Sequence, residues 1–330
     1  MENRNLETLA QELGLKKQQV ETVLELTAEG NTIPFIARYR KEKTGNLDET
    51  QIKAIIDMDK SLTALQDRKE TVLAKIEAQG KLTDQLKAAI EAAEKLADVE
   101  ELYLPYKEKR RTKATIAREA GLFPLARLIL QNSPNLKAEA EKLTSEAFPT
   151  ADKALAGAVD ILIEAFSEDN SLRSWTYNEI WNNSDITSTL KDQSLDEKET
   201  FKIYYDFEDK VSKLQGYRTL ALNRGEKLGV IKVSFKHNLE KMHRFYSARF
   251  KQKNDYIEEV INQSLKKKII PAMERRIRSE LTEAAEDGAI QLFSQNLRNL
   301  LLVSPLKGKM VLGFDPAFRT GAKLAVVDQT

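Results

Sequence analysis

Apolar residues recur at every third or fourth position along most of this chain, a spacing typical of amphipathic helices. The spacing predicts two short helices that are separated at Gly14. A long helix is then expected from an N-cap at Asp48 to a stop at Gly80. Its residues would make a rod of roughly 45–50 Å at 1.5 Å per residue. The pattern continues from Leu82 and predicts a returning helix that ends before Pro105.

The pattern is more broken in the middle of the chain. Short helices are expected to alternate with turns at Pro124, Pro134 and Pro149 up to about residue 182. The polar, acidic stretch 183–199 is interpreted as a domain linker, and a further helical group follows it. Alternating β-branched residues in 228–235 predict a single isolated strand. A helix from about residue 254 is expected to stop or kink at Pro271, and a second long helix runs on towards residue 303.

The last twenty residues have a different character. Two strand-like segments, 310–314 and 323–327, flank turn-forming residues and predict a β-hairpin. One hairpin cannot bury a core alone, so we expect it to open an α/β domain of a longer protein. The expected fold class is mainly α, with three parts. These are a helical N-terminal domain over 1–190, a central helical region with a long spine helix over 191–305, and the hairpin of a truncated domain over 306–330.

Composition narrows the chemistry that this chain can perform. It has no cysteine, which excludes disulfides, thiolate metal sites and thiol nucleophiles. No apolar run approaches the roughly 18 residues that a membrane helix needs. The N-terminal residues are too polar to open a secretory signal. We therefore expect a soluble, cytoplasmic protein without a membrane partner.

Charge is segregated along the chain, although the net charge is only +1. The segment 107–113 carries five Lys or Arg residues against one Glu, whereas 192–210 carries seven acidic residues against three basic ones. Separated patches of this kind permit local phosphate binding. They do not give the whole molecule a field that attracts nucleic acid.

Three segments supply candidate contacts with nucleic acid, and the first is the N-terminal helix pair. Ala10, Gly14 and the branched residue at position 20 have the spacing of a helix-turn-helix, in which glycine allows the tight turn. The second helix would then present Lys16, Lys17 and Gln19 outward. An ordinary helical hairpin has the same spacing, and no arginine is available there to read a guanine edge.

The second segment is a short basic loop. Lys109, Arg110, Arg111 and Lys113 stand close together between two predicted helices, where they could reach several phosphates at once. The alternative is a solvated loop whose charges pair with the acidic helix that precedes it.

In the third segment, from residue 235 to 253, the cations Arg244, Arg249 and Lys251 interleave with aromatic residues. Bases stack on aromatic rings while cations follow the phosphate backbone, so this mixture suits single-stranded nucleic acid. The alternative is that the rings face the core and the cations face water. His237 and His243 also lie here, but without a third ligand nearby they do not predict a metal site.

Four stretches together resemble the Tex family of bacterial transcription accessory proteins. They are GNTIPFIARYRKE at 30–42, LYLPYK at 102–107, RTLALNRGE at 218–226, and LGFDP at 312–316 with RTG at 319–321. The resemblance spans essentially the whole chain. It implies a helical N-terminal region with a helix-turn-helix, followed by an RNase H-like domain of the YqgF type that the hairpin would open. It also implies helix-hairpin-helix motifs and an OB-fold RNA-binding domain, neither of which is in this sequence.

The functional hypothesis is a transcription accessory scaffold that binds DNA or RNA without sequence specificity and contacts the transcription machinery. The first alternative is a metal-dependent RNase H-like nuclease or resolvase. Such nucleases place a metal-binding carboxylate where Asp315 ends the first strand, although Asp315-Pro316 is also an ordinary turn opener. The second alternative is a pure protein–protein scaffold. Because no catalytic set is complete, we expect no enzymatic activity, no cofactor or metal, and no small-molecule substrate.

Overall fold

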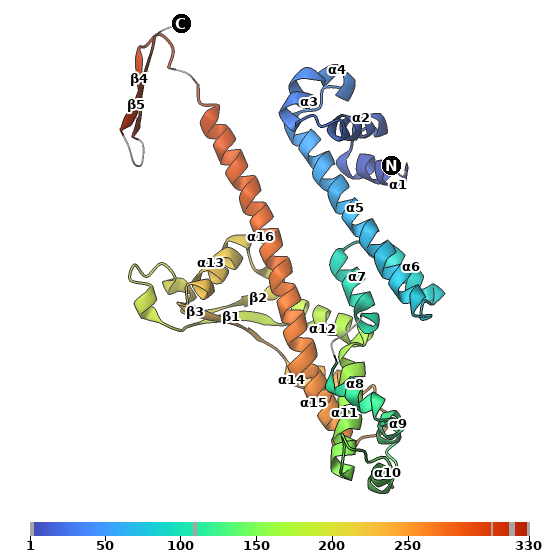
Figure 1. Ribbon diagram of the computed structural model, residues 1–330. Coiled ribbons are helices and arrows are strands. Elements are labelled where there is room, and N and C mark those ends of the chain that lie inside the picture. The colour runs from blue at the N-terminus through green and yellow to red at the C-terminus, as the bar shows by residue number, and fades with distance from the viewer. Residues whose placement is uncertain (1–2, 108–110, 305, 317–320, 329–330) are drawn as a thin grey trace. The chain divides into compact units, whose positions relative to one another are not determined.

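The computed structural model describes residues 3–107, 111–304, 306–316 and 321–328, and it is mainly helical (Figure 1). The chain forms two compact units, Met1–Ser171 and Leu172–Thr330. The regular elements described in the first unit are all helices or helical turns. These are α1 (Asn3–Leu13), α2 (Lys17–Ala28), α3 (Ile33–Tyr39), α4 (Lys41–Thr44), α5 (Glu49–Ala78), α6 (Asp84–Ala92), α7 (Leu96–Tyr103), the 3-10 turn Leu104–Tyr106, α8 (Lys113–Glu119), α9 (Phe123–Leu130), α10 (Leu136–Lys142) and α11 (Ala151–Ser167).

A first core cluster lies where α1, α2 and α3 pack on the N-terminal half of α5. Leu9, Val20, Ile36 and Ile52 are fully buried in it. Gly14 has a φ of +62° and makes the turn between α1 and α2. The predicted pair of short helices broken at Gly14 is therefore confirmed.

The long helix α5 begins and ends where the sequence predicts. The Asp48 side chain accepts a hydrogen bond from the Gln51 backbone N–H at 2.8 Å, and the Gln51 side chain accepts one from the Asp48 N–H at 3.1 Å. This reciprocal pair is a capping box. Gly80, with a φ of +64°, follows the last turn. The C-terminal half of α5 contributes Val72 and Ile76 to a second core cluster with α6 and α7.

The prediction of a single returning helix after α5 is wrong, because α6 and α7 are separate. Ala93 leaves the helical conformation with φ −64° and ψ 131°, and Lys95 is extended as well. Ile90 and Leu96 are six positions apart, which is not a helical repeat. The break allows Ile90 and Val99 to be buried in the same cluster.

The remaining helices of the first unit are short and alternate with turns, as predicted, and α8, α9 and α10 pack against α11 or one another. Pro124 occupies the first turn of α9, where its missing N–H breaks no helical hydrogen bond. Gly157 stands in the middle of α11. A Cβ at this position would lie 2.7 Å from side-chain atoms of Leu122 and of Phe148, so glycine allows the close packing.

The second unit combines helices with two small sheets. Its elements are α12 (Asn170–Asn183), β1 (Asp185–Leu190), the 3-10 turns Gln193–Leu195, Lys202–Tyr204 and Val211–Lys213, β2 (Asp206–Lys210), α13 (Gly216–Lys227), β3 (Ile231–Lys236), α14 (Leu239–Ser247), α15 (Asp255–Ser264), the π-helical turn Leu265–Ile269, α16 (Ile270–Leu301), β4 (Val311–Pro316) and β5 (Ala322–Val327).

Strand β1 is the centre of a three-stranded antiparallel sheet with the order β2–β1–β3 (Figure 1). Thr187 of β1 pairs with Glu208 of β2 and with Ser234 of β3. Two predictions are therefore wrong: the stretch 183–199 is not a linker, and the strand near 231–236 is not isolated. The apolar signal of β1 is weak, because Ser188 is buried in it and donates a hydrogen bond to the Tyr204 carbonyl at 2.6 Å.

The acidic residues that suggested a linker instead organise the loop after β1. Asp196 is buried and accepts hydrogen bonds from the Phe201 N–H at 2.7 Å and the Tyr205 hydroxyl at 3.0 Å. Burial works to raise the pKa of Asp196, but these hydrogen bonds and those of Thr200 outweigh it and hold the pKa below its usual value. The carboxylate therefore acts as a structural acceptor.

The predicted interruption at Pro271 is confirmed. The π-helical turn Leu265–Ile269 separates α15 from α16, and Pro271 is the second residue of α16. Proline has no N–H to donate to the preceding turn, so the regular hydrogen-bond ladder cannot continue through it. Asn254, the expected start of this segment, caps α15 by accepting a hydrogen bond from the Ile257 N–H at 2.8 Å.

The two halves of α16 have different surroundings. In the first half, Arg278 donates hydrogen bonds to Asn223 at 2.7 Å and to Glu226 at 2.8 Å, both on α13. Buried residues on α16 extend from Ile270 to Ala285. Beyond Ala285 every residue of the helix is exposed. The exposed residues include the large apolar side chains Ile290, Leu292, Phe293, Leu297, Leu300 and Leu301.

Strands β4 and β5 form the predicted antiparallel hairpin. Val311 pairs with Val327 at one end, and Asp315 pairs with Lys323 near the other. In the described part of the chain, no helix is both long and apolar enough to cross a membrane.

Two helical glycines offer a matched test of the packing. Gly157→Ala should lower the free energy of unfolding by about 1–3 kcal/mol, because its methyl group overpacks the space beside Leu122 and Phe148. Gly288→Ala in α16 should raise it by up to about 1 kcal/mol, because nothing lies within 4 Å of the added Cβ and alanine favours helix. Urea unfolding followed by circular dichroism measures both. Equal stability of the two variants would contradict the packing of Gly157.

Candidate nucleic-acid interface

The N-terminal helix pair presents fewer side chains than the helix-turn-helix interpretation requires. Lys16 is exposed just before α2, but the Lys17 Nζ pairs with Glu7 Oε1 of α1 at 3.0 Å. Gln19 turns inward, since its Nε2 donates a hydrogen bond to the Thr44 carbonyl at 3.0 Å. The expectation that Gln19 points outward is therefore wrong. The helix pair clearly builds the first core cluster, whereas its contact with DNA stays a prediction.

The basic loop is described only in part. Lys109 and Arg110 lie outside the described residues. Arg111 pairs with Glu119 of α8 at 2.7 Å, so its partner lies in the helix that follows the loop. Lys113, the first residue of α8, is exposed, and no acidic side chain in the described part of the chain forms an ion pair with it.

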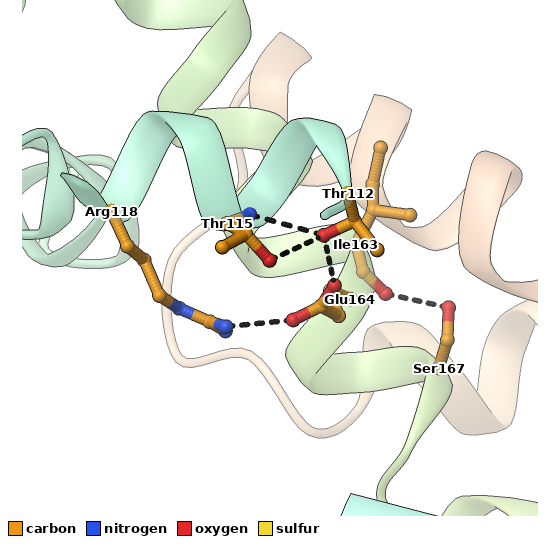
Figure 2. A network of polar contacts seen from close by, with 6 residues as sticks. All are labelled: Thr112, Thr115, Arg118, Ile163, Glu164 and Ser167. Atoms are coloured by element: carbon orange, nitrogen blue, oxygen red, sulfur yellow. Dashed lines mark hydrogen bonds and ion pairs between the residues drawn. The ribbon is translucent and has the colours of Figure 1, made fainter. Parts of the chain in front are cut away.

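A polar network fixes the start of α8 against α11 (Figure 2). The Thr112 hydroxyl accepts a hydrogen bond from the Thr115 N–H at 3.0 Å and donates one to Glu164 Oε2 at 2.9 Å. Arg118 Nη1 lies 2.7 Å from the other oxygen of Glu164, whose side chain is only 11% exposed. Thr112 stands between two of the candidate cations, so this network holds the backbone from which both project.

The third segment places its candidate cations at the end of α14 and in the turn after it. Arg244, Arg249 and Lys251 are all exposed. Over the residues that the structure describes, no carboxylate forms an ion pair with any of the three. The Arg249 guanidinium instead lies over the Phe245 ring, with 5.3 Å between the Cζ atom and the ring centroid.

The aromatic residues of this segment divide between core and surface. Tyr246 is fully buried, and its hydroxyl lies 2.8 Å from the Thr176 hydroxyl of α12. Phe245 is partly exposed and stacks on Trp175 of α12, with 3.7 Å between the ring centroids and 5° between the planes. Tyr246 therefore fits the interpretation that the rings face the core, whereas its neighbour Phe245 fits the interpretation that they lie at the surface. Sequence reasoning missed Trp175 because it lies 70 positions before Phe245.

Each of the two histidines lies beside a carboxylate. His237 is bound by Ser184 at 2.9 Å and by Glu274 at 2.7 Å, and His243 is bound by Glu258 at 2.7 Å. Each ring therefore has its own carboxylate partner. Among the described residues, no group of three or more His, Asp or Glu side chains could hold a metal ion.

Asp315 and Asp328, the two acidic residues of the hairpin, lie at opposite ends of it. Asp315 pairs with Lys323, and Asp328 follows the last residue of β5. The five steps from residue 323 to residue 328 span about 17 Å in an extended strand. Two metal ions that share ligands lie only about 4 Å apart, so these carboxylates cannot hold one metal pair.

Comparison with known proteins identifies the family. Residues 3–77 match the family model described as the Tex-like protein N-terminal domain, and residues 131–293 match the one described as Tex central region-like. The Bacillus subtilis (strain 168) protein YdcI is 45% identical over 334 residues, which cover 98% of this chain and 46% of that protein. The transcriptional accessory protein Tex of Neisseria gonorrhoeae is 39% identical over 333 residues, covering 98% and 44%.

A human relative is more distant. The S1 RNA-binding domain-containing protein 1 of Homo sapiens is 27% identical over 345 residues, which cover 98% of this chain and 35% of that protein. The chain thus spans less than half the length of each of these relatives. Both Tex models match it in succession, and relatives that carry the Tex name align along nearly all of it, so this chain belongs to the Tex family.

Proposed function

We propose that this protein is a transcription accessory scaffold that binds nucleic acid through its phosphates and without sequence specificity. The observation that carries the proposal is the exposed group Arg244, Arg249 and Lys251, whose charges no described carboxylate neutralises. A cation that already has an acidic partner must give up that partner before it binds a phosphate. An unpaired cation binds directly and releases a counterion from the nucleic acid.

Lack of sequence specificity follows from the side chains that are available. Base readout in the major groove needs several outward donors and acceptors on one helix. On α2, Gln19 and Lys17 are engaged within the fold. Contacts from Lys16, Lys113 and the α14 group would reach phosphates and leave the base edges unread.

The proposed partners are nucleic acid and the transcription machinery. Support comes from the relatives, one named a transcriptional accessory protein and another named for an RNA-binding S1 domain. The proposal places the protein in the bacterial cytoplasm, where transcription occurs. It also assigns the hairpin β4–β5 to the opening of an RNase H-like domain of the YqgF type and α1–α2 to a helix-turn-helix, both on the family resemblance. The proposal includes no catalysis by this chain.

The proposal predicts weak, salt-dependent binding. Labelled duplex and single-stranded oligonucleotides should bind with dissociation constants of roughly 10⁻⁴–10⁻⁶ M at physiological salt, because the contacts are to phosphates. Fluorescence anisotropy at two salt concentrations, with two unrelated sequences, measures this. Affinity that does not change with salt, or that differs strongly between the sequences, would contradict the proposal.

A pair of double variants tests which cations make the contacts. Arg244→Ala with Lys251→Ala should weaken binding and reduce the slope of log K against log salt by about 1.4–1.8, the value for two phosphates. Lys17→Ala with Arg111→Ala removes the same net charge but from cations that already pair with Glu7 and Glu119. This control should change the slope less. Equal slopes for both double variants would mean that only net charge matters.

Asp315 should be catalytically silent in this chain. One carboxylate with water holds Mg²⁺ weakly, because the ion keeps its hydration shell unless several ligands converge. Incubation with Mg²⁺ or Mn²⁺ and structured DNA or RNA should therefore give no cleavage above that of an Asp315→Ala variant. Metal-dependent cleavage that disappears in Asp315→Ala would overturn the scaffold and favour the nuclease.

A further inference from the structure

A hollow of about 620 Å³ lies on the surface of the second unit between α12 and α14. Its lining consists of Trp175 from α12 and of Asn238, Lys241, Arg244, Phe245 and Ala248. The volume is within the range of roughly 300–1,000 Å³ that is usual for small-molecule sites. The hollow therefore has room for one nucleotide unit at the edge of the Trp175–Phe245 stack.

The stack is fixed by the core directly beneath it. Trp175 and Phe245, which pair at the surface, are each followed in the sequence by a buried residue. Those buried neighbours, Thr176 and Tyr246, are joined by a hydrogen bond of 2.8 Å. Tyr246 also meets Phe245 edge-on, at 6.2 Å and 67°. The aromatic surface is thus supported from beneath by buried contacts, and a surface that is already ordered reduces the entropy cost of binding.

The face-to-face geometry of Trp175 and Phe245 has a physical meaning. Isolated aromatic pairs prefer offset or edge-to-face arrangements, because the negative faces of two stacked rings repel each other. Here the planes are within 5° of parallel, and Arg249 covers the Phe245 ring. The cation offsets the negative charge of the ring faces. Alternating layers of rings and a guanidinium are the arrangement that also accepts a nucleobase.

Cations surround the hollow on the side of α14. Lys241 is held in place by Glu179, whose oxygen lies 2.7 Å from its Nζ and whose side chain is only 8% exposed. Arg244 borders the hollow and has no ion pair among the described residues. Because Lys241 already has an acidic partner, Arg244 is the cation beside the aromatic platform that can bind a phosphate directly. An apolar peptide would gain little from these charges, whereas a nucleotide uses both components.

We infer that this hollow binds an unpaired base of single-stranded nucleic acid, which stacks on the Trp175 ring of the Trp175–Phe245 pair while its phosphate contacts Arg244. The inference rests on the proposed function and extends it by naming the strand form and the residues that receive the base. In a duplex the bases are stacked on one another, so they cannot occupy the hollow. The site should consequently prefer single strands over duplexes.

Tryptophan emission tests the inference directly. The chain has two tryptophans, so in a Trp181→Phe variant the emission reports on Trp175 alone. The Trp181 ring lies nearly parallel to that of Tyr177, with 6.2 Å between the ring centroids, and phenylalanine keeps an aromatic ring at this position. A short thymidine homopolymer should quench the emission. A duplex of equal length and an abasic strand with the same number of phosphates should not.

Matched variants separate stacking from folding. Phe245→Leu keeps an apolar side chain but removes the ring that supports Trp175, so affinity for the homopolymer by anisotropy should fall about tenfold, as for the loss of one stacked base. Trp175→Phe keeps a ring and should retain most of the affinity. Tyr39→Leu removes an exposed ring of α3 and should have no effect. Circular dichroism establishes that each variant is folded, and if Phe245→Leu is not, the emission titration of the Trp181→Phe variant decides alone.

The outcomes distinguish this inference from the proposed function. Homopolymer binding by anisotropy without quenching would overturn the inference and leave the proposed function standing. Equal quenching by the abasic strand, or unchanged affinity in a folded Phe245→Leu variant, would reduce the pair to a packing contact between α12 and α14. Absence of binding to every oligonucleotide at low salt would overturn both.

Discussion

The hydrogen bond between the Thr176 and Tyr246 hydroxyls joins α14 to α12 within the core, and the candidate site lies directly above it. Both residues are fully buried, and both hydroxyls also lie within hydrogen-bond distance of the Leu172 carbonyl of α12, at 2.8 Å for Thr176 and 3.4 Å for Tyr246. A bond of this kind specifies one relative position of the two helices. Each partner has a neighbour at the surface, which is why Trp175 and Phe245 meet as parallel rings. A core contact thereby sets the geometry of a surface platform.

Local chemistry explains which helices could be predicted from the sequence. Asp48, Gln51 and Gly80 satisfy or terminate the ends of α5 with groups that lie within a few residues, so the sequence alone defines its length. Pro271 acts on its own preceding turn in the same way. The separation of α6 from α7 also has a local signal, because the six-residue spacing from Ile90 to Leu96 does not fit one continuous helix. The many apolar residues of the segment nevertheless led to the prediction of a single helix.

Strand β1 could not be predicted from its local pattern, because its stability depends on hydrogen-bond partners in other segments and not on its own apolar residues. It has little apolar alternation, and Ser188 is buried only because the Tyr204 carbonyl accepts its hydroxyl. The acidic residues after β1 give this segment the polar composition that is typical of an exposed linker. Asp196 is nevertheless buried, because the backbone N–H groups of Thr200 and Phe201 satisfy its carboxylate. Hydrogen-bond partners, which composition does not reveal, reverse the interpretation of this segment.

The candidate site shows the same division. Charge runs identified most of the cations, since a run of Lys or Arg is visible in any sequence. Whether a cation is available depends on partners such as Glu7 for Lys17 and Glu119 for Arg111. Only the fold supplies those partners, as it supplies Trp175. Sequence therefore proposes the chemistry, and tertiary structure selects the residues that can perform it.

Helix α16 is continuous, but its two halves need not have the same lifetime. Packing against α13, together with the Arg278 hydrogen bonds, stabilises the turns before Ala285. The later turns depend on the intrinsic helix propensity of their residues, which by itself supports only marginal helix in water. Backbone amides in the second half should therefore open and exchange with deuterium sooner than those in the first. Protection of the amides from exchange would thus decline along α16, so the free energy of local opening would fall from its first turns to its last although the helical geometry stays the same.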